Sequence, residues 1–503
     1  MIEPAEPTES TEFTESAGPA EPVEPAEIIV VGAGIAGLVL ARELVLQGHA
    51  VRLLEGESRA GGQVAALQLD GLRIDAGAEA FATRGGIVSQ YLEHLGLADR
   101  IIAPLQAPAW LHAADGTTVP LPASSMLGIP AAPLADDVVR VVGRPGAWRG
   151  VLDAVLPAAV GSTLPTVGAL VRRRMGDAIL ERLVAPVVEG IHSTHPDDLP
   201  VSAVPGLVDH LLREKSLGRA VARMRIDAPA GSLVASLEGG MATLADALLA
   251  ELDRFGVPIE YGVRVAEVHP DHVVLAGAAH AAAGYAPAAH AVARHALAVQ
   301  PRAEVEVRRG RVAVAAPGLI APADGVAATR TETHLVTLVL AADIPGGPAL
   351  ATAPRGTGVL VARGSVVAAR ALTHVTAKWS NIRAAAGGRE VVRLSYEQPP
   401  SPEQVRRDAQ ALLGVSIPSD RVLAAHTVTW QRAGRIVVGD DIPVVGEQVA
   451  GTGLAAVIAH ARAVAEQFGP PQADPPQFGP PQAGVDPRKQ LGPIEHHEKE
   501  TAA

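Results

Sequence analysis

The sequence has 503 residues, of which 48% are hydrophobic and 19% charged, so it can bury the cores of two or three globular domains. It contains no cysteine, which excludes disulfides, thiolate metal sites and cysteine nucleophiles. Aromatic residues make up 3%, too few for a platform on which nucleic-acid bases stack.

The net charge of −12 is concentrated in the two ends of the chain. Residues 1–27 carry eight Glu and no basic residue, and residues 469–503 add a net charge of −2. The remaining body carries about −2, which gives no support to a nucleic-acid partner. The N-terminus lacks the basic start of a signal peptide. We therefore expect a cytoplasmic protein with disordered acidic and Pro-rich tails and no transmembrane segment; peripheral membrane contact stays open.

The folded chain begins with a strand–turn–helix–strand pattern. The apolar run Ile28–Val31 predicts a buried parallel strand, and Leu38–Leu46 predicts a helix that ends before Gly48. Ala50–Leu54 predicts the next strand. Between the first strand and the helix lies Gly32–Gly37, a G-x-G-x-x-G turn.

Each glycine of this turn has a physical role. Gly32 permits the tight turn, Gly34 lets a pyrophosphate approach the backbone, and Gly37 lets the helix pack closely against the strand. The helix N-terminus offers free N–H groups to the phosphates. Glu55 follows Gly37 by 18 residues, near the spacing of about 20 typical of a carboxylate that binds a ribose diol. A lone glycine turn is often purely structural, but the complete pattern predicts a dinucleotide site.

An extension of this pattern indicates which dinucleotide binds. Glu55 begins E-x-x-x-R-x-G-G, in which a second glycine pair, Gly61–Gly62, lets the chain return beside the pyrophosphate and places Arg59 near the phosphates. Taken alone, Arg59 is more typical of a solvated surface residue. Asp75–Glu79 adds another glycine for close approach. The combination resembles the amine-oxidase-like flavoproteins, which bind FAD.

The middle of the chain contains a helical region and a second sheet. Proline and glycine interrupt helical runs between residues 110 and 230, and the H-x-x-H in Gly190–Leu199 is followed by proline, so we expect a loop there and no metal site. An apolar face from Met241 to Leu252 predicts a helix, and Tyr261–Val268 predicts a strand that returns to the cofactor sheet. We assign no function to the Ala-rich residues 276–298. Further strands are predicted at 335–340, 358–362 and 391–396, and a final helix starts after Gly451.

Four further stretches make the resemblance more specific. They are GIHSTHPDDL at 190–199, EGGMATLADAL at 238–248, PRGTGVLVA at 354–362 and ALTHVTAKW at 371–379. With them the chain resembles the FAD-dependent coproporphyrinogen III and protoporphyrinogen oxidases of the actinobacterial type over about residues 28–467. The segment from Trp430 to Gly446 is shorter than in that family.

The resemblance implies an α/β fold with a Rossmann-like FAD/NAD(P)-binding domain, a mixed-sheet substrate domain and a helical subdomain. We assign 28–85, 230–320 and 420–468 to the FAD-binding domain, 86–110 and 321–419 to the substrate domain and 111–229 to the helical subdomain. Flavin contacts then fall on Gly32, Ala33, Gly34, Ile35, Ala36, Gly37, Glu55, Gly56, Arg59, Gly62, Gln63, Gly77, Ala78, Glu79, Ala80, Val265, Trp430, Gly451, Thr452 and Gly453.

The activity implied by the resemblance is oxidation of coproporphyrinogen III to coproporphyrin III in heme biosynthesis, with oxygen reduced to hydrogen peroxide and a possible hand-over of product to a ferrochelatase. The substrate carries carboxylates, and we expect Arg84 and Lys378 to bind them. No residue set predicts a catalytic acid–base or nucleophile, which agrees with chemistry supplied by the cofactor.

Three alternatives stay open at this stage. The substrate can instead be protoporphyrinogen IX, which has two vinyls in place of two propionates. The chain can be another amine-oxidase-like oxidase or desaturase, although four Trp and four Tyr leave few residues for the aromatic cage of an amine oxidase. It can also bind flavin without turnover, as a heme-pathway scaffold. The oligomeric state is not predicted.

Overall fold

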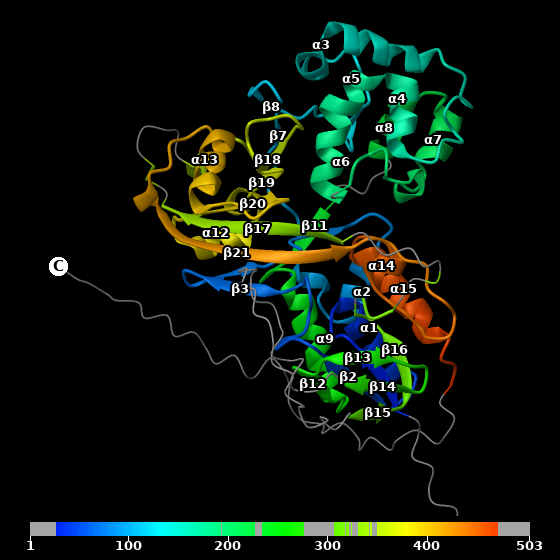
Figure 1. The fold of residues 1–503 in the computed structure, drawn as a ribbon. Helices are drawn as coiled ribbons and strands as arrows, with labels where there is room; N and C mark the ends of the chain where they lie inside the picture. The colour runs from blue at the N-terminus through cyan, green and yellow to red at the C-terminus, as the bar shows by residue number, and fades with distance from the viewer. Residues whose placement is uncertain are drawn as a thin grey trace, which may run out of the picture.

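A computed structural model of the chain describes residues 27–192, 194–226, 234–275, 306–316, 318–320, 323, 330–341, 343–344 and 350–470. The two predicted tails (apart from residues 27, 469 and 470) and the Ala-rich stretch 276–298 lie outside the described residues. The described chain forms three layers, with a helical region at one end, a large sheet in the middle and a parallel sheet at the other end (Figure 1).

The parallel sheet has four strands in the order β12-β2-β1-β16. They are β1 (Ile28–Val31), β2 (Val51–Glu55), β12 (Ile259–Tyr261) and β16 (Arg311–Val314). Side chains alternate along β1, so Ile28 and Val30 pack in one core and Ile29 and Val31 in another.

The first of these cores lies beneath three helices, α1 (Ile35–Leu46), α9 (Ala242–Arg254) and α15 (Leu454–Glu466). The second is covered by the antiparallel strands β13 (Val265–Val268), β14 (His272–Leu275) and β15 (Val307–Arg309). A parallel sheet buried on both faces is the predicted Rossmann-like arrangement, which the structure confirms.

The strand predicted at 261–268 is wrong as a single element. Only β12, ending at Tyr261, joins the parallel sheet beside β2. Gly262, with a φ of +72°, turns the chain away, and Val265 then pairs with Leu275 in the separate three-stranded sheet. A glycine in the left-handed region ends the strand because it reverses the backbone direction.

The middle layer is a seven-stranded sheet in the order β21-β17-β20-β19-β18-β7-β8. Its strands are β7 (Ala109–His112), β8 (Thr118–Pro120), β17 (Arg330–Leu340), β18 (Gly358–Val361), β19 (Ala371–His374), β20 (Glu390–Tyr396) and β21 (Val422–Ala433). Neighbours are antiparallel except β18 and β7, which are parallel, so the sheet is mixed.

The register of this sheet separates its two faces. Val336 and Leu338 pack against α13 (Pro402–Leu413), whereas Val339 packs on the opposite face with Ile74. Leu335 lies opposite Ser395, and Thr337 opposite Arg393, so these residues share the face that carries Val339. That face carries polar side chains in the middle of the molecule.

The helical region has a core of its own, to which Leu170, Leu211 and Val221 contribute. It contains α3 (Asp136–Val151), α4 (Val167–Met175), α5 (Asp177–Ile179), a π-helix over Leu180–Val184, α6 (Ala185–His192), α7 (Leu207–Glu214) and α8 (Leu217–Ile226). The buried guanidinium of Arg174 donates to Asp153, which also accepts from the Ser216 hydroxyl at 2.7 Å and thereby ties α8 to α4.

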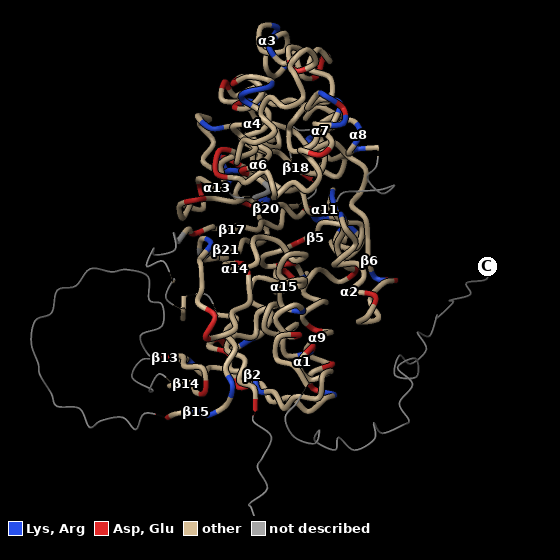
Figure 2. Tube along the Cα trace, turned by 90° about the vertical axis from the view of Figure 1, so that its right-hand side faces the viewer, with Lys and Arg blue, Asp and Glu red and all other residues tan. Residues whose placement is uncertain are grey.

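The remaining elements connect these layers. They are β3 (Ala66–Leu69), β4 (Leu72–Asp75), β5 (Phe81–Ala82), α2 (Ile87–His94), β6 (Ile101–Ile102), β9 (Ser125–Met126), β10 (Ile129–Pro130), β11 (Val234–Leu237), α11 (Val375–Lys378), α12 (Ser380–Ala386) and α14 (Glu447–Ala450). Basic and acidic residues are spread over all three layers of the described chain (Figure 2). None of the described helices is long and apolar enough to cross a bilayer.

Candidate functional site

The glycine corner at the end of β1 is shaped by close backbone contacts. Gly32 has a φ of +102°, a conformation that favours glycine. A Cβ on Gly37 would lie 1.9 Å from the carbonyl oxygen of Gly32, so α1 can pack this closely only without a side chain there. A Cβ on Gly34 would meet nothing within 4 Å. The corner is therefore tightly packed beneath Gly37 and open above Gly34, at the N-terminus of α1.

Glu55 closes one side of this corner. Its Oε2 accepts the backbone N–H of Ala33 at 2.7 Å, and its Oε1 accepts the N–H of Glu57 at 2.9 Å. The carboxylate lies at the carboxyl end of β2, where ligands of parallel α/β sheets bind. The N–H of Val263 donates to the Glu55 carbonyl at 2.9 Å, which brings the segment leading to Val265 alongside.

A second chain crossing lies over the corner. The N–H of Gly61 donates to the Ala33 carbonyl at 2.8 Å, and a Cβ on Gly62 would lie 3.3 Å from the Gly34 Cα. A Cβ on Gly77 would lie 2.1 Å from the Gln63 carbonyl oxygen. The glycines predicted for close approach therefore allow these segments of the chain to cross one another at short distance.

Trp430 and Arg59 lie beside this crossing. The Trp430 Nε1 donates to the carbonyl of Ala76 at 3.1 Å, so β21 is joined to the Gly77 loop. The Arg59 guanidinium lies 5.7 Å from the Trp430 ring centroid and donates to the Gly62 carbonyl at 3.0 Å. Residues more than 350 positions apart therefore meet here, and Arg59, although exposed, lies beside the Trp430 ring.

The segment before the last helix also reaches the corner. The N–H of Val445 donates to the Val314 carbonyl at 2.8 Å, at the end of β16. A Cβ on Gly446 would lie 3.9 Å from that of Ala36. Gly451 and Gly453, with φ of +95° and +98°, then turn the chain into α15, whose N-cap is Gly453. Between β21 and α14 the described chain forms no further helix.

A large cavity opens between the Gly77 loop, the face of the seven-stranded sheet that carries Val339 and the end of α6. Its empty volume is about 1380 Å³, including the open mouth. The lining consists of Gln63, Gly77, Ala78, Glu79, Ala80, Glu189, Gly190, Thr333, Leu335, Arg370, Ala371, Thr373, Lys378, Arg393, Ser395 and Trp430. The structure thus brings the predicted residues 77–80 and Trp430 together with Lys378 in one cavity, next to the corner.

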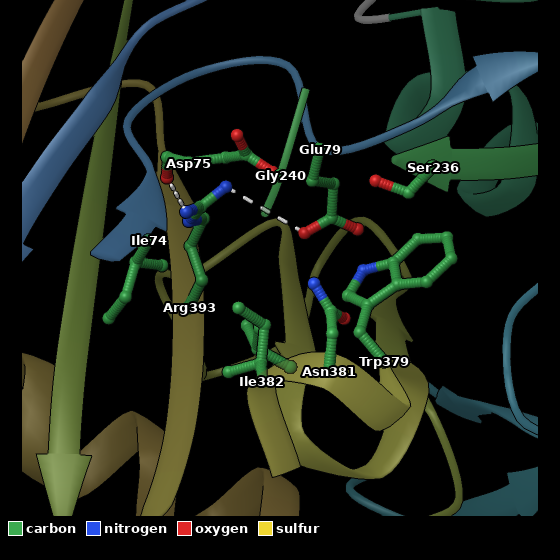
Figure 3. Close-up of a pocket in the computed structure, with 10 residues that line it drawn as sticks. Ile74, Asp75, Glu79, Ser236, Gly240, Trp379, Asn381, Ile382 and Arg393 are labelled. Atoms are coloured by element: carbon green, nitrogen blue, oxygen red, sulfur yellow. Dashed lines mark hydrogen bonds and ion pairs between the residues drawn. The ribbon is translucent and has the colours of Figure 1, made fainter. Parts of the chain in front are cut away.

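A group of paired charges forms part of this lining, and two of its members, Glu79 and Arg393, also line the smaller pocket drawn in Figure 3. The Lys378 ammonium pairs with Glu79 Oε1, and the Arg393 Nη1 lies 3.7 Å from Glu79 Oε2. Arg393 also donates to the carbonyls of Asp75 and Gly77. Burial would raise the pKa of Glu79, but Lys378 and Arg393 outweigh it and hold the pKa below its usual range. Glu79 is therefore an ionised carboxylate.

Asp75, on the far side of Arg393, behaves differently. Burial raises its pKa from 3.8 to about 6, against the opposing effects of the N–H groups of Met241 and Ala242 and of Arg393. Its backbone carbonyl, and not its carboxylate, receives Arg393. A Cβ on Gly240 would lie 2.7 Å from Asp75 Oδ1, so the E-G-G-M turn contacts this group directly.

Arg84 lies apart from the cavity lining. Its Nη1 donates to the Pro205 carbonyl at 3.4 Å, and its Nη2 lies 3.5 Å from the Met126 sulfur. It therefore joins the loop after β5 to the helical region. Lys378 does line the cavity, although its ammonium is already paired with Glu79.

The G-I-H-S-T-H-P-D-D-L stretch has a structural role in the described residues. Arg172 forms a two-pronged pair with Asp197, with both distances 2.8 Å, and His195 Nδ1 accepts the N–H of Asp197 at 3.2 Å. Within the described ranges no group of three or more His, Asp or Glu is arranged to hold a metal ion. The loop fixes the end of α6, which contributes Glu189 to the cavity.

Arg393 was missed by the reasoning from sequence. Its signal was an arginine between the apolar residues Val392 and Leu394 of a predicted strand. A buried arginine of this kind needs a partner, but the sequence does not show that the partner is Glu79, more than 300 residues earlier.

The family comparison agrees with this geometry. A model of the family described as flavin containing amine oxidoreductase matches residues 35–290. A coproporphyrinogen III oxidase of Propionibacterium freudenreichii is 30% identical over 43% of this chain, and that match spans 38% of the relative's length. One of Mycobacterium tuberculosis is 29% identical over 73% of this chain and 75% of its own length. The mitochondrial protoporphyrinogen oxidase of Nicotiana tabacum is 27% identical over 45% of this chain and 47% of its own length.

Solved structures show the same fold at lower identity. A candidate protoporphyrinogen oxidase from Exiguobacterium sp. 255-15 matches with a TM-score of 0.68 and 20% identity over 88% of this chain and 98% of that one. The cyclohexylamine oxidase of Brevibacterium oxydans matches with a TM-score of 0.54 and 13% identity over 88% of this chain and 100% of that one. At these identities the likeness establishes the fold. The chain belongs to the flavin containing amine oxidoreductase family, and it is a flavin-dependent oxidoreductase.

Proposed function

We propose that the chain oxidises coproporphyrinogen III to coproporphyrin III, with FAD as the bound cofactor, oxygen as the electron acceptor and hydrogen peroxide as the second product. One observation carries this proposal: the large cavity shares its Gly77–Ala80 wall with the chain crossing over the glycine corner. A ligand in the cavity and a flavin on the corner are therefore neighbours. The names of the relatives supply the porphyrinogen as substrate, and the product would then pass to a ferrochelatase.

The residues at the corner fit FAD. The open space above Gly34 has room for the diphosphate, and the N–H groups at the start of α1 point toward it. Glu55 lies where the ribose of the adenosine half would be held. Gly62, Gln63 and Gly77 continue the track from the corner to the cavity, and the N-terminus of α15, at Gly453, is proposed to offer its positive end to the flavin.

When bound, FAD accepts the electrons that leave a substrate carbon and passes them to oxygen. The chain supplies position and shields the reacting atoms from water. Aromatisation favours the oxidation, and loss of electrons from the substrate acidifies its pyrrole N–H groups, so no strong protein base is required. The cavity lining agrees with this, since its carboxylates, Glu79 and Glu189, are both paired with cations.

Substrate binding needs cations, because coproporphyrinogen carries four propionates. We propose Lys378 as a cation that faces the substrate from the inner cavity, since it lines the space and is one-fifth exposed. Arg84 lies apart from the cavity lining, so we propose that it acts indirectly, by joining the loop after β5 to the helical region through Pro205.

Aerobic turnover tests this function. The purified protein, loaded with FAD, is given coproporphyrinogen III or protoporphyrinogen IX, and porphyrin fluorescence and peroxide are measured together. We expect faster oxidation of coproporphyrinogen, with peroxide formed in proportion to the electrons removed. Faster oxidation of protoporphyrinogen would reassign the substrate, and turnover of neither would leave a flavin-binding protein without this activity.

A further inference from the structure

A second hollow adjoins the cavity and has no role in the account above. Its empty volume is about 930 Å³, and it shares Glu189 and Arg370 with the large cavity. The connection between β18 and β19 forms most of its wall, and Glu397, just after β20, closes one side. We call this space the outer chamber. Because two lining residues are common to both spaces, a ligand in the large cavity can extend into the outer chamber.

The first arginine of the outer chamber, Arg363, is anchored at its base. Its Nε lies 2.7 Å from Glu189 Oε1. The Glu189 side chain is 8% exposed, whereas that of Arg363 is 64% exposed. A buried carboxylate thus fixes the root of the guanidinium, and no partner of the two terminal amino groups is found among the described residues. These groups form the fork that binds carboxylates with two parallel hydrogen bonds.

The second arginine, Arg370, has a partner that is easily replaced. Its Nη1 lies 3.1 Å from Glu397 Oε1, and the Glu397 side chain is 64% exposed. Such solvent-exposed pairs contribute about 0–1 kcal/mol, so a ligand carboxylate can take the place of Glu397. The Arg370 side chain itself is 25% exposed, and it lies where the two spaces meet.

The cations of the inner cavity are already paired with a carboxylate that has little contact with solvent. Lys378 and Arg393 both neutralise Glu79, whose side chain is 19% exposed. Separating a pair of this kind leaves a charge with little solvent, which is strongly unfavourable. Of the arginines and lysines that line the two spaces, those of the outer chamber therefore have the donors most available to an anionic ligand.

We propose that the outer chamber is a carboxylate-binding site, in which Arg363 and Arg370 bind propionates of the porphyrinogen whose ring lies in the large cavity. This assignment rests on the proposed function and adds the part of the protein that recognises the charged edge of the substrate. Glu189 is a positioning residue, because it holds Arg363 in place.

Binding of the product porphyrin tests the site without turnover. The variants Arg363→Gln, Arg370→Gln and the double variant are titrated with coproporphyrin III and with protoporphyrin IX, and Kd is measured by fluorescence quenching. A lost hydrogen bond to a charged group corresponds to about a tenfold rise in Kd for each single variant. Arg407→Gln is the matched control, because Arg407 is half-exposed and pairs with Glu403 on α13, which packs on the opposite face of the sheet.

Comparing the Kd changes for the two ligands shows which propionates bind in the outer chamber. If the variants lose more affinity for coproporphyrin than for protoporphyrin, the chamber binds the two propionates that only coproporphyrin has. If they lose the same affinity for both ligands, the chamber binds the two propionates that both ligands share. A Kd for coproporphyrin within twofold of wild type in the double variant, as in the control, overturns the assignment. If that result occurs while the wild type oxidises coproporphyrinogen, only the outer chamber is refuted. A wild type that neither binds nor oxidises either tetrapyrrole refutes the proposed function and the chamber together.

Discussion

The glycine corner and the cavity wall are built from different kinds of interaction. At the corner, Gly37 and Glu55 act within a single strand–helix–strand unit, and what matters is the room left around the backbone. At the wall, Glu79, Lys378 and Arg393 meet from distant parts of the chain, and what matters is the balance of their charges. We therefore expect substitutions at the corner to act by blocking space, and substitutions at the wall to act by disturbing the pairing of charges.

The largest effect is expected at Gly34. The variant Gly34→Val should fold, because its Cβ would meet no protein atom within 4 Å and its φ of −67° suits any residue. It should lose flavin almost completely, because the side chain fills the space proposed for the diphosphate. Visible absorbance after desalting measures bound flavin, and circular dichroism measures folding.

Gly439→Val is the control for this variant, because Gly439 also has nothing within 4 Å of its Cβ position but lies in the segment after β21. It should keep its flavin. A yellow, FAD-replete Gly34→Val protein would contradict the assignment of the turn.

The next effect is expected at Lys378. In Lys378→Met the carboxylate of Glu79 keeps Arg393 as its remaining cation, and the free energy of unfolding should fall by about 3 kcal/mol, as for other broken pairs with little solvent. Urea denaturation measures this change. Adding Glu79→Gln should recover part of the loss, because a partly buried carboxylate left with only the more distant Arg393, at 3.7 Å, becomes a neutral amide, while Arg393 still donates to the carbonyls of Asp75 and Gly77. If the double variant is less stable than the single one, charge balance is not what holds the wall.

A smaller effect, confined to a pH range, is expected at Asp75. The folded protein raises the pKa of Asp75 from 3.8 to about 6, so between these values it binds the proton more tightly than the unfolded chain. The contribution of Asp75 to the free energy of unfolding should therefore fall by about 2–3 kcal/mol as the pH rises from about 4 to 6, and stay low above that.

Asp75→Asn should remove this slope. The difference in unfolding free energy between the wild type and the variant isolates Asp75, because Glu79, with its lowered pKa, contributes equally to both. A difference that does not change between pH 4 and 6 would show that Asp75 is not buried in the way described.

The smallest effect is expected at Arg84. Arg84→Ala removes a hydrogen bond to the Pro205 carbonyl and should raise KM for coproporphyrinogen about threefold while FAD stays bound. Steady-state kinetics with equal flavin content measures this change. An unchanged KM would remove Arg84 from substrate binding.

The same contrast explains what the sequence could predict. The strand at Ile28–Val31, the glycine corner and the helix after it follow from local spacing, since each contact spans few residues. The end of β12 at Tyr261 was missed, because Gly262 resembled a tolerated glycine within one strand. The link between Glu79 and Arg393 joins the loop after β4 to β20, more than 300 residues later, and no local pattern in the sequence predicts it.

Anaerobic mixing of the FAD-loaded protein with coproporphyrinogen III tests the central claim most directly. We predict that the flavin absorbance band bleaches as the substrate gives up two electrons to each bound FAD, and that the band returns and porphyrin absorbance appears when oxygen is admitted. A flavin band that stays unchanged beside the reduced substrate, or a protein that remains colourless after incubation with excess FAD, would contradict the account.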